Sequence, residues 1–418
     1  MPYELRRRRR TRRNMSEYLP PESSPPTKKK KEMLSYLPPE VITLILSRLP
    51  VESAVKCTAV CKAWYALIKD PSFIPTHLQQ AVSLQEGDLL HHGFIFFHMC
   101  WDNGAFVGYK KLRLPFKSGG FKYFGTCNGL ICLVNVYPFP WDVILWNPCI
   151  RRHFILPKPD LPHGTIRRAT LGFGFDSLSD DYKALLLVVF HKDGQDSIEA
   201  WLFSLNKCSW RRITEVSPKH RCCSGVRQMA FVNGALHWHG FLNYDALSHV
   251  IFAFDLSTEK FHVMSYPNTS VHFHPHISVI KYEESIAVII PASHNYNRVD
   301  LWVMKEYSVN SSWTNVLHPT GEGRELVIDT AGLMDVYGVR KNGELLVNVT
   351  REHGRGCELA TLDLNCHQNE QRLKRLGIRT QHGDSYVGSF VESLVLFDKG
   401  EQDTKGQKRK NRKPKKRY

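Results

Sequence analysis

The sequence lacks the long apolar runs and the leader that membrane and secreted proteins carry. No window of the chain approaches about 18 consecutive apolar residues, so we expect no membrane-spanning helix. The chain starts with MPYELRRRRRTRR, a charged segment with no apolar stretch behind it. That pattern argues against a secretory signal, and we expect a protein of the nucleus, the cytoplasm or both, with no membrane partner.

A metal or disulfide framework is also missing. The 11 cysteines are scattered, and none falls in a CxxC pair. In a reducing compartment they should be free thiols. His272, His274 and His276 alternate as ligands on one strand face would, but Pro275 interrupts that strand and no Cys or carboxylate lies close in sequence. We therefore expect no metal and no cofactor, and an exposed loop at the three histidines.

Signatures of catalysis are missing as well. The sequence has no nucleophile elbow and no HExxH motif, and Gly172-Phe173-Gly174 precedes a strand-like run where a nucleotide-binding loop needs a helix. The vicinal Cys222 and Cys223 lie in a basic stretch, which leaves a reactive thiol as an alternative. The sequence therefore predicts a protein without enzymatic activity.

The middle of the chain has almost no net charge. The formal net charge is +16; residues 1–32 hold eleven Lys/Arg and four Glu, which gives +7, and residues 399–418 hold ten Lys/Arg, one Glu and one Asp, which gives +8. Residues 33–398 therefore carry +16 − 15 = +1. A nucleic-acid groove would place basic residues within the fold, so nucleic acid is not an expected partner. We expect both terminal segments to be disordered basic tails.

The C-terminal tail KRKNRKPKKRY is the candidate nuclear-localisation signal. Its basic residues are Lys408, Arg409, Lys410, Arg412, Lys413, Lys415, Lys416 and Arg417. The N-terminal runs RRRRRTRR and KKKK are of the same kind, with a solubilising tail as the alternative.

Residues 33–76 predict three short helices. Pro38 and Pro39 open the first helix, and Pro50 stops it. The third helix has an apolar stripe at i, i+4, i+7 and i+8 spacing, made of Val60, Trp64, Leu67 and Ile68. Three short helices in about 40 residues make a poor core of their own. We therefore expect the leftover apolar face to be covered by a partner, or by this chain's own second domain.

Residues 90–398 show the two-residue alternation of strands, broken by turn signals at regular intervals. Counted at residues 129, 180, 233, 284, 342 and 392, the spacings are 51, 53, 51, 58 and 50. Each hairpin is followed by a second strand pair, in which five positions align: Trp146, Trp201, Phe252, Trp302 and Leu359. A period near 50 residues with four strands per unit predicts a β-propeller.

The two ends of this repeat region predict how the ring closes. The last hairpin, residues 386–397, lacks a second strand pair, and a spare hairpin precedes the first full unit. N-terminal strands that complete the last blade give six blades, although five or seven would also fit. The expected fold is thus a multi-domain chain, with a small all-α three-helix module before an all-β propeller.

Two segments carry a family resemblance. The segment LPPEVITLILSRLPVESAVKCTAVCKAWYALIKDPSF resembles an F-box in the order and spacing of its apolar and proline positions. Downstream, NGLICL, LWNP and LGFGFD resemble the kelch-like, F-box-associated domain of plant proteins. One departure is Thr58, where this plant group more often has a basic residue. The resemblance implies an F-box at residues 33–76 and an F-box-associated propeller at residues 90–398.

That resemblance implies the substrate-recognition subunit of an SCF-type, cullin-RING ubiquitin ligase. The F-box would bind a Skp-type adaptor, and through it a cullin, while the propeller would bind an unknown target protein and do no chemistry itself. The residues expected to bind the adaptor are Leu37, Pro38, Ile45, Leu49, Pro50, Val60, Cys61 and Trp64. Trp64 could equally belong to the core of the helical module.

Three other functions remain open at the level of sequence. The chain could be an F-box scaffold that acts without a cullin, a nuclear protein that binds nucleic acid through its tails, or a propeller enzyme with a bound metal. The target itself cannot be read from the chain, although Arg151, Arg152, Arg167 and Arg168 would favour an acidic or phosphorylated ligand.

Overall fold

The computed structural model describes the chain between residues 37 and 398, with gaps. The described residues are 37–84, 88–92, 97–101, 108–112, 114, 121–135, 141–163, 165–192, 194–214, 221–222, 229–242, 249–267, 277–291, 299–316, 333–340, 342–351, 356–363, 373–380 and 386–398. Both basic tails, with the candidate localisation signal, lie outside them, as do Cys223 and the three alternating histidines. The chain divides into two compact units, Met1–Ile45 and Leu46–Tyr418.

The helices lie at the N-terminal end of the described chain. They are α2 (Pro39–Ser47), α3 (Val51–Cys57), α4 (Lys62–Ile68) and α5 (Phe73–Leu84). The first three are the helices that the sequence predicts, and Pro39 and Pro50 stand at the start of α2 and at the N-cap of α3. Helix α5 was not predicted, so the expectation of three helices was incomplete. None of the described helices is long and apolar enough to cross a membrane.

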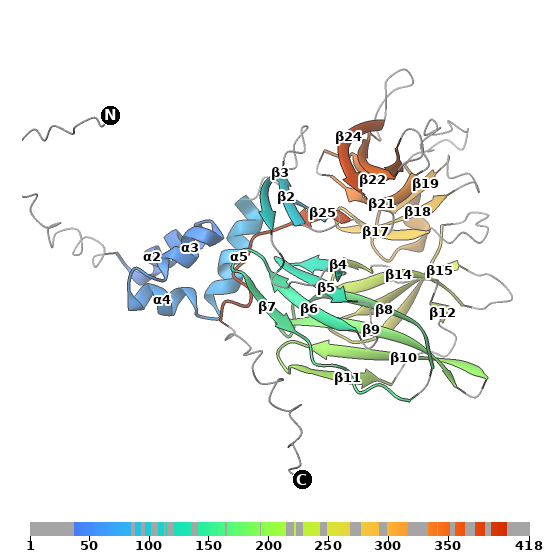
Figure 1. Cartoon of the computed structure of the whole chain (residues 1–418), viewed down its shortest axis with the longest axis horizontal. Coiled ribbons are helices and arrows are strands. Elements are labelled where there is room, and N and C mark those ends of the chain that lie inside the picture. Colours follow the sequence, from blue (N-terminus) through green and yellow to red (C-terminus); the bar gives the residue numbers. More distant parts are fainter. Residues whose placement is uncertain are drawn as a thin grey trace, which may run out of the picture. The chain divides into compact units, whose positions relative to one another are not determined.

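The rest of the described chain forms six antiparallel sheets, which are the blades of a propeller (Figure 1). The first three in chain order are β4 (Phe121–Cys127), β5 (Leu130–Asn135), β6 (Asp142–Asn147) and β7 (Arg152–Ile155); β8 (Thr165–Asp176), β9 (Asp181–Lys192), β10 (Gln195–Ser204) and β11 (Ser209–Ile213); and β12 (Arg221–Cys222), β13 (Ala230–Val232), β14 (Ala235–Phe241), β15 (His249–Asp255) and β16 (Phe261–Ser265).

The next two sheets are β17 (Ser278–Tyr282), β18 (Ser285–Pro291), β19 (Val299–Met304) and β20 (Trp313–Asn315), and β21 (Leu333–Val339), β22 (Leu345–Thr350), β23 (Cys357–Leu362) and β24 (Leu373–Thr380). A short 3-10 helix, Asn310–Ser312, precedes β20. The sixth sheet is β25 (Tyr386–Phe390), β1 (Asp88–His92), β2 (Phe97–Trp101) and β3 (Gly108–Leu112).

The sixth sheet closes the ring. Strand β25 pairs with β1, so that Leu90 lies opposite Gly388, and in Figure 1 the red end of the chain lies beside the teal strands. The first strands of successive blades pack in the order β4, β8, β13, β17, β21, β25 and back to β4. The prediction of six blades closed by N-terminal strands is confirmed. One detail was wrong: residues 391–398 do not form a second strand, because β1 occupies that place beside β25.

The repeated turns set the register of the blades. Asn128 and Gly129 join β4 to β5 with φ of 51° and 78°, and Asn233 and Gly234 join β13 to β14 with φ of 49° and 75°. Two consecutive left-handed residues make the hairpin turn whose twist matches that of the strands, and Asn-Gly favours it. The five aligned positions all fall in the strand before the last of their blades: β6, β10, β15, β19 and β23.

Apolar side chains fill the space between neighbouring blades. Leu187 and Leu202 of one blade pack with Leu236 and Phe252 of the next. Phe97 of the closing sheet packs edge-on against Trp146 of β6, with ring centroids 5.7 Å apart. Since each blade hides its faces only against its neighbours, the ring is stable when all blades are present.

Candidate protein-docking surface

Helix α2 presents an apolar face to solvent. The Pro38 carbonyl accepts hydrogen bonds from the backbone N–H groups of Val41 (3.0 Å) and Ile42 (3.2 Å), which starts the helix. Val41, Leu44 and Ile45 are 38%, 46% and 47% exposed. Their i, i+3, i+4 spacing places them on one side of the helix. Large apolar side chains gathered on one exposed helix face indicate an interaction surface.

A second exposed apolar pair lies around the start of α4. Val60 is 59% exposed in the turn before the helix, and Tyr65 is 47% exposed in its first half. Cys61 is the N-cap of α4, since its Sγ accepts a hydrogen bond from the backbone N–H of Trp64 at 3.5 Å. The cap fixes where the helix begins and so where these two side chains point.

The interior beneath α3 to α5 is already closed. Five apolar side chains in this part of the chain are almost fully buried: Leu46, Val51, Ala54, Ile68 and Phe73. His77 of α5 is buried as well, and its Nε2 lies 2.8 Å from the Leu49 carbonyl oxygen. The exposed residues Val60 and Tyr65 therefore lie on a part of the chain whose own interior is already packed.

The structure divides the expected adaptor-binding residues into two groups. Five of them are exposed: Pro38, Ile45, Pro50, Val60 and Cys61. Leu37, Leu49 and Trp64 are half-buried, so they contribute both to the module and to its surface. Sequence reasoning missed Val41, Leu44 and Tyr65 as exposed apolar positions. The i, i+3, i+4 pattern on the first helix could have singled out Val41 and Leu44; no pattern marked Tyr65.

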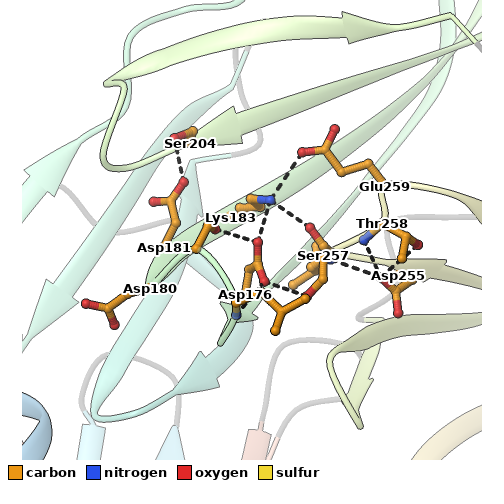
Figure 2. A network of polar contacts seen from close by, with 12 residues as sticks. Asp176, Asp180, Asp181, Lys183, Ser204, Asp255, Ser257, Thr258 and Glu259 are labelled. Atoms are coloured by element: carbon orange, nitrogen blue, oxygen red, sulfur yellow. Dashed lines mark hydrogen bonds and ion pairs between the residues drawn. The ribbon is translucent and has the colours of Figure 1, made fainter.

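The propeller contains a buried polar network that resembles a reactive site in composition (Figure 2). Lys183 Nζ donates to Asp176 Oδ2 (2.8 Å), to the Leu256 carbonyl oxygen (2.7 Å) and to Glu259 Oε1 (3.2 Å). Asp176 also accepts from the hydroxyl groups of Ser179 and Ser257. All three ammonium protons are therefore used within the protein, and none is left for a ligand.

This network joins two blades. Asp176 and Lys183 belong to β8 and β9, while Ser257 and Glu259 lie in the turn between β15 and β16. Burial alone would raise the pKa of Asp176, but the hydrogen bonds from Lys183, Ser179 and Ser257 outweigh it and hold that pKa far below its ordinary value. Asp176 is thus a charged structural acceptor at the joint between the blades.

Among the described residues, other reactive groups are either inert or dispersed. Burial raises the pKa of the Cys127 thiol to about 12, and it also raises the pKa of Cys132 and Cys149, so these thiols stay protonated at neutral pH. No group of three His, Cys, Asp or Glu side chains in the described part of the chain could hold a metal ion.

The four arginines singled out in the sequence do not form one cluster. Arg151 and Arg152 lie at the turn from β6 to β7, at the same end of the ring as Gly129. The inner strands β4 and β8 run side by side there: a Cβ added to Gly125 would lie 3.7 Å from the Cβ of Phe173. Arg167 lies six residues before Phe173 in β8, about 20 Å away along the strand. An acidic ligand could therefore meet only one pair.

These features define a class of protein. The described chain combines short helices that carry exposed apolar side chains with a six-bladed propeller. Two family models match it: "F-box-like" over residues 34–76 and "F-box associated beta propeller domain" over residues 91–369. The chain belongs to the F-box proteins that carry an F-box-associated β-propeller.

Curated relatives from Arabidopsis thaliana agree with this family. F-box protein CPR1 is 32% identical over 318 residues, which cover 68% of this chain and 73% of that protein. F-box protein At4g22390 is 27% identical over 405 residues, 90% of this chain and 94% of that one. F-box/kelch-repeat protein At3g23880 is 26% identical over 301 residues, 68% of this chain and 80% of that protein.

Proposed function

We propose that this chain is the substrate-recognition subunit of an SCF-type, cullin-RING E3 ubiquitin ligase. The helical module binds a Skp-type adaptor, which connects it to a cullin, and the propeller binds the protein to be ubiquitylated. The observation that carries the proposal is the exposure of Val41, Leu44 and Ile45 on α2, and of Val60 and Tyr65 around the start of α4. Burying side chains of this kind contributes about 1.5–3 kcal/mol each, before association costs.

In this role the chain is not a catalyst. It holds the target near a ubiquitin-loaded conjugating enzyme, so that a bimolecular encounter becomes a local one with a high effective concentration. The buried network around Lys183 supports a non-catalytic propeller, because its donors are used within the protein. The protonated Cys127 thiol also supports a non-catalytic propeller, because a protonated thiol is a poor nucleophile at neutral pH.

The adaptor surface can be tested with charged substitutions at exposed positions. Ile45→Glu and Val60→Asp should each weaken binding to a purified Skp-type adaptor at least tenfold, because a charge would have to be buried in an apolar interface. Both positions are exposed, so the thermal midpoint of the free protein should stay within about 2 °C. Isothermal titration calorimetry and thermal denaturation measure the two quantities.

The matched control is Leu178→Asp, since Leu178 is an apolar residue in the β8–β9 turn that is 84% exposed. It should bind the adaptor as the unmodified chain does. If Ile45→Glu and Val60→Asp bind equally well, the proposed surface is wrong. If the adaptor binds but a cullin never joins the complex on size-exclusion chromatography, the chain is an F-box scaffold that acts without a cullin.

A further inference from the structure

The residues that follow the last strand are buried although they form no strand. Residues 391–398, here called the C-terminal strap, come directly after β25. Ser393, Leu394 and Leu396 are buried, and Phe397 is only 8% exposed. A segment without ladder hydrogen bonds is held in the interior only if side chains elsewhere satisfy its backbone. The strap is therefore packed in a defined conformation and is not a frayed chain end.

On one side the strap is fixed to the blade β4–β7. Asn147 is completely buried, and its Nδ2 donates to the carbonyl oxygens of Ser393 and Val395, both at 2.9 Å. Its Oδ1 accepts from the Cys149 backbone N–H at 3.0 Å, which fixes the orientation of the amide. Gly129 lies so close that a Cβ there would be 2.4 Å from Ser393 Oγ.

The closing sheet holds the start of the strap as well. Lys110 of β3 pairs with Glu392 at 3.1 Å. Burial lowers the pKa of His77 of α5, and the hydrogen bond with the Leu49 carbonyl and the attraction of the Glu392 carboxylate both oppose that change.

On its other side the strap meets helix α4. The Phe397 ring centroid lies 5.7 Å from the Lys69 Nζ, which follows α4, and 5.7 Å from the Arg152 guanidinium carbon of β7. Both distances are within the range of cation–π attraction. The ring thus links a helix residue to a blade residue, and all of these residues belong to the compact unit Leu46–Tyr418.

We propose that the C-terminal strap is a coupling element that fastens the end of helix α4, and with it the helix α5 that packs on α4, to the blade β4–β7, so that these two helices and the propeller move as one body. The chain itself provides one connection between them, from Leu84 to Asp88. Two attachments restrict rotation more than one does, and Phe397 provides the second between Lys69 at the end of α4 and Arg152 of β7. The benefit for ubiquitin transfer, a target held at a constant position relative to the adaptor, rests on the proposed function; the coupling does not.

The coupling is tested by measuring a distance distribution in the full chain. Two unnatural amino acids that carry spin labels are introduced, one at Ala66, which is exposed on α4, and one at Glu284, which is exposed in the β17–β18 turn. Cysteine labelling is unsuitable because the native Cys61 and Cys208 are exposed and would be labelled too. Two variants break the strap at different places. Phe397→Ala removes the ring between the two cations, and Asn147→Asp keeps the acceptor for Cys149 but turns the donor into an oxygen that repels two carbonyls.

We expect one narrow distribution for the unmodified chain and at least a twofold broader one for each variant. Asp255→Asn is the matched control: Asp255 stands at the end of β15 as Asn147 stands at the end of β6, and its Oδ1 accepts from the Ser257 and Thr258 backbone N–H groups. An asparagine keeps that acceptor, so its distribution should stay narrow.

Two outcomes would overturn the proposed coupling. Equal widths in Phe397→Ala and the unmodified chain overturn the coupling, and so does a broad distribution in the unmodified chain. If Asn147→Asp fails to fold, Phe397→Ala alone still gives the answer, because it leaves the Asn147 contacts in place. Adaptor affinity is measured separately by calorimetry. A chain with a narrow distance distribution that does not bind the adaptor would contradict the proposed function but not the coupling by the strap.

Discussion

At the joint between the second and third blades in chain order, Lys183 of β9 contacts Leu256 and Glu259 in the β15–β16 turn. Its side chain is 8% exposed and that of Asp176 only 2%. A pair of buried charges is costly to desolvate, and it is tolerated here because Lys183 donates three hydrogen bonds and both carboxylate oxygens of Asp176 accept hydrogen bonds. The joint is therefore sensitive to loss of one member and insensitive to salt.

We expect Lys183→Met to destabilise the protein by about 3–5 kcal/mol at pH 7, because Asp176 would remain buried without its counter-charge. Urea denaturation followed by tryptophan fluorescence measures the change. Lys56→Met is the control, since Lys56 pairs with Glu52 at 2.8 Å but both side chains are about 70% exposed (73% and 69%). It should leave the denaturation midpoint unchanged.

The pH dependence of the Lys183→Met effect has a definite sign. The pKa of Asp176 is depressed in the folded protein, so its contribution to stability is complete above the ordinary carboxyl pKa and is lost as the pH falls below it. The unfolding free energy of the unmodified chain should therefore fall below about pH 4. The gap to Lys183→Met should narrow as the pH falls, because the buried Asp176 of the variant has lost its counter-charge and takes up a proton at a higher pH than Asp176 of the unmodified chain. A gap that stays constant from pH 7 to pH 3 would contradict this account.

At the scale of elements, two equivalent turns allow the strap to be separated from backbone strain. Gly129 and Gly234 occupy the same place in their hairpins, with φ of 78° and 75°. A Cβ at Gly234 would meet nothing within 4 Å, whereas one at Gly129 would lie 2.6 Å from the Val391 carbonyl oxygen. The turn is the same, and only the presence of the strap differs.

Gly129→Ala should accordingly destabilise the protein more than Gly234→Ala. Both substitutions incur about 1–2 kcal/mol for a left-handed alanine, and Gly129→Ala should add about 1–3 kcal/mol because the strap backbone must move. Thermal denaturation gives the difference, and amide hydrogen exchange of Leu394 to Leu396 should rise only in Gly129→Ala. Equal destabilisation by the two substitutions would mean that the strap yields freely at this point.

At the scale of the whole molecule, charge is concentrated in segments outside the described residues. Residues 1–32 and 399–418 together carry +15 of the formal +16. We propose that the C-terminal tail directs the protein to the nucleus, whereas the folded part serves protein binding.

Removing both tails should leave the thermal midpoint and the adaptor affinity unchanged while nuclear accumulation is lost. Fluorescence microscopy of tagged chains and calorimetry measure these effects. Salt-sensitive retention on heparin should disappear with the tails, because phosphate-like binding follows their charge. A tailless chain that still accumulates in the nucleus would place the signal elsewhere; one that loses adaptor affinity would show that the tails contribute to docking.

The sequence predicted the repeating parts of this fold and missed the parts that occur once. Polar turn signals and aligned apolar positions recur from blade to blade, so their spacing indicated six blades and the way the ring closes. Helix α5 and the strap occur once and follow no period. The sequence of Leu394 to Phe397 predicted a strand, because an apolar pattern cannot show that β1 already occupies the position beside β25.

The candidate site was predicted to a similar extent. Apolar periodicity located Ile45 and Val60, which are exposed, but it could not separate the face turned to solvent from the face turned inward. Leu46 and Ile68 belong to the same apolar patterns in the sequence as Ile45 and Val60, but they are buried. That choice is made by α5, whose Phe73 and His77 cover the inner face, and α5 was absent from the prediction.

The pairing of β25 with β1 has a consequence for synthesis of the protein on the ribosome. The strand that closes the ring begins at Tyr386, so the other described strands of the ring have been synthesised before the first and last strands can meet. Until then the growing polypeptide exposes the edge of β1 that later pairs with β25, and an exposed strand edge can pair with other chains. Translation that stops before this point should therefore give an open ring that aggregates more readily than the closed one.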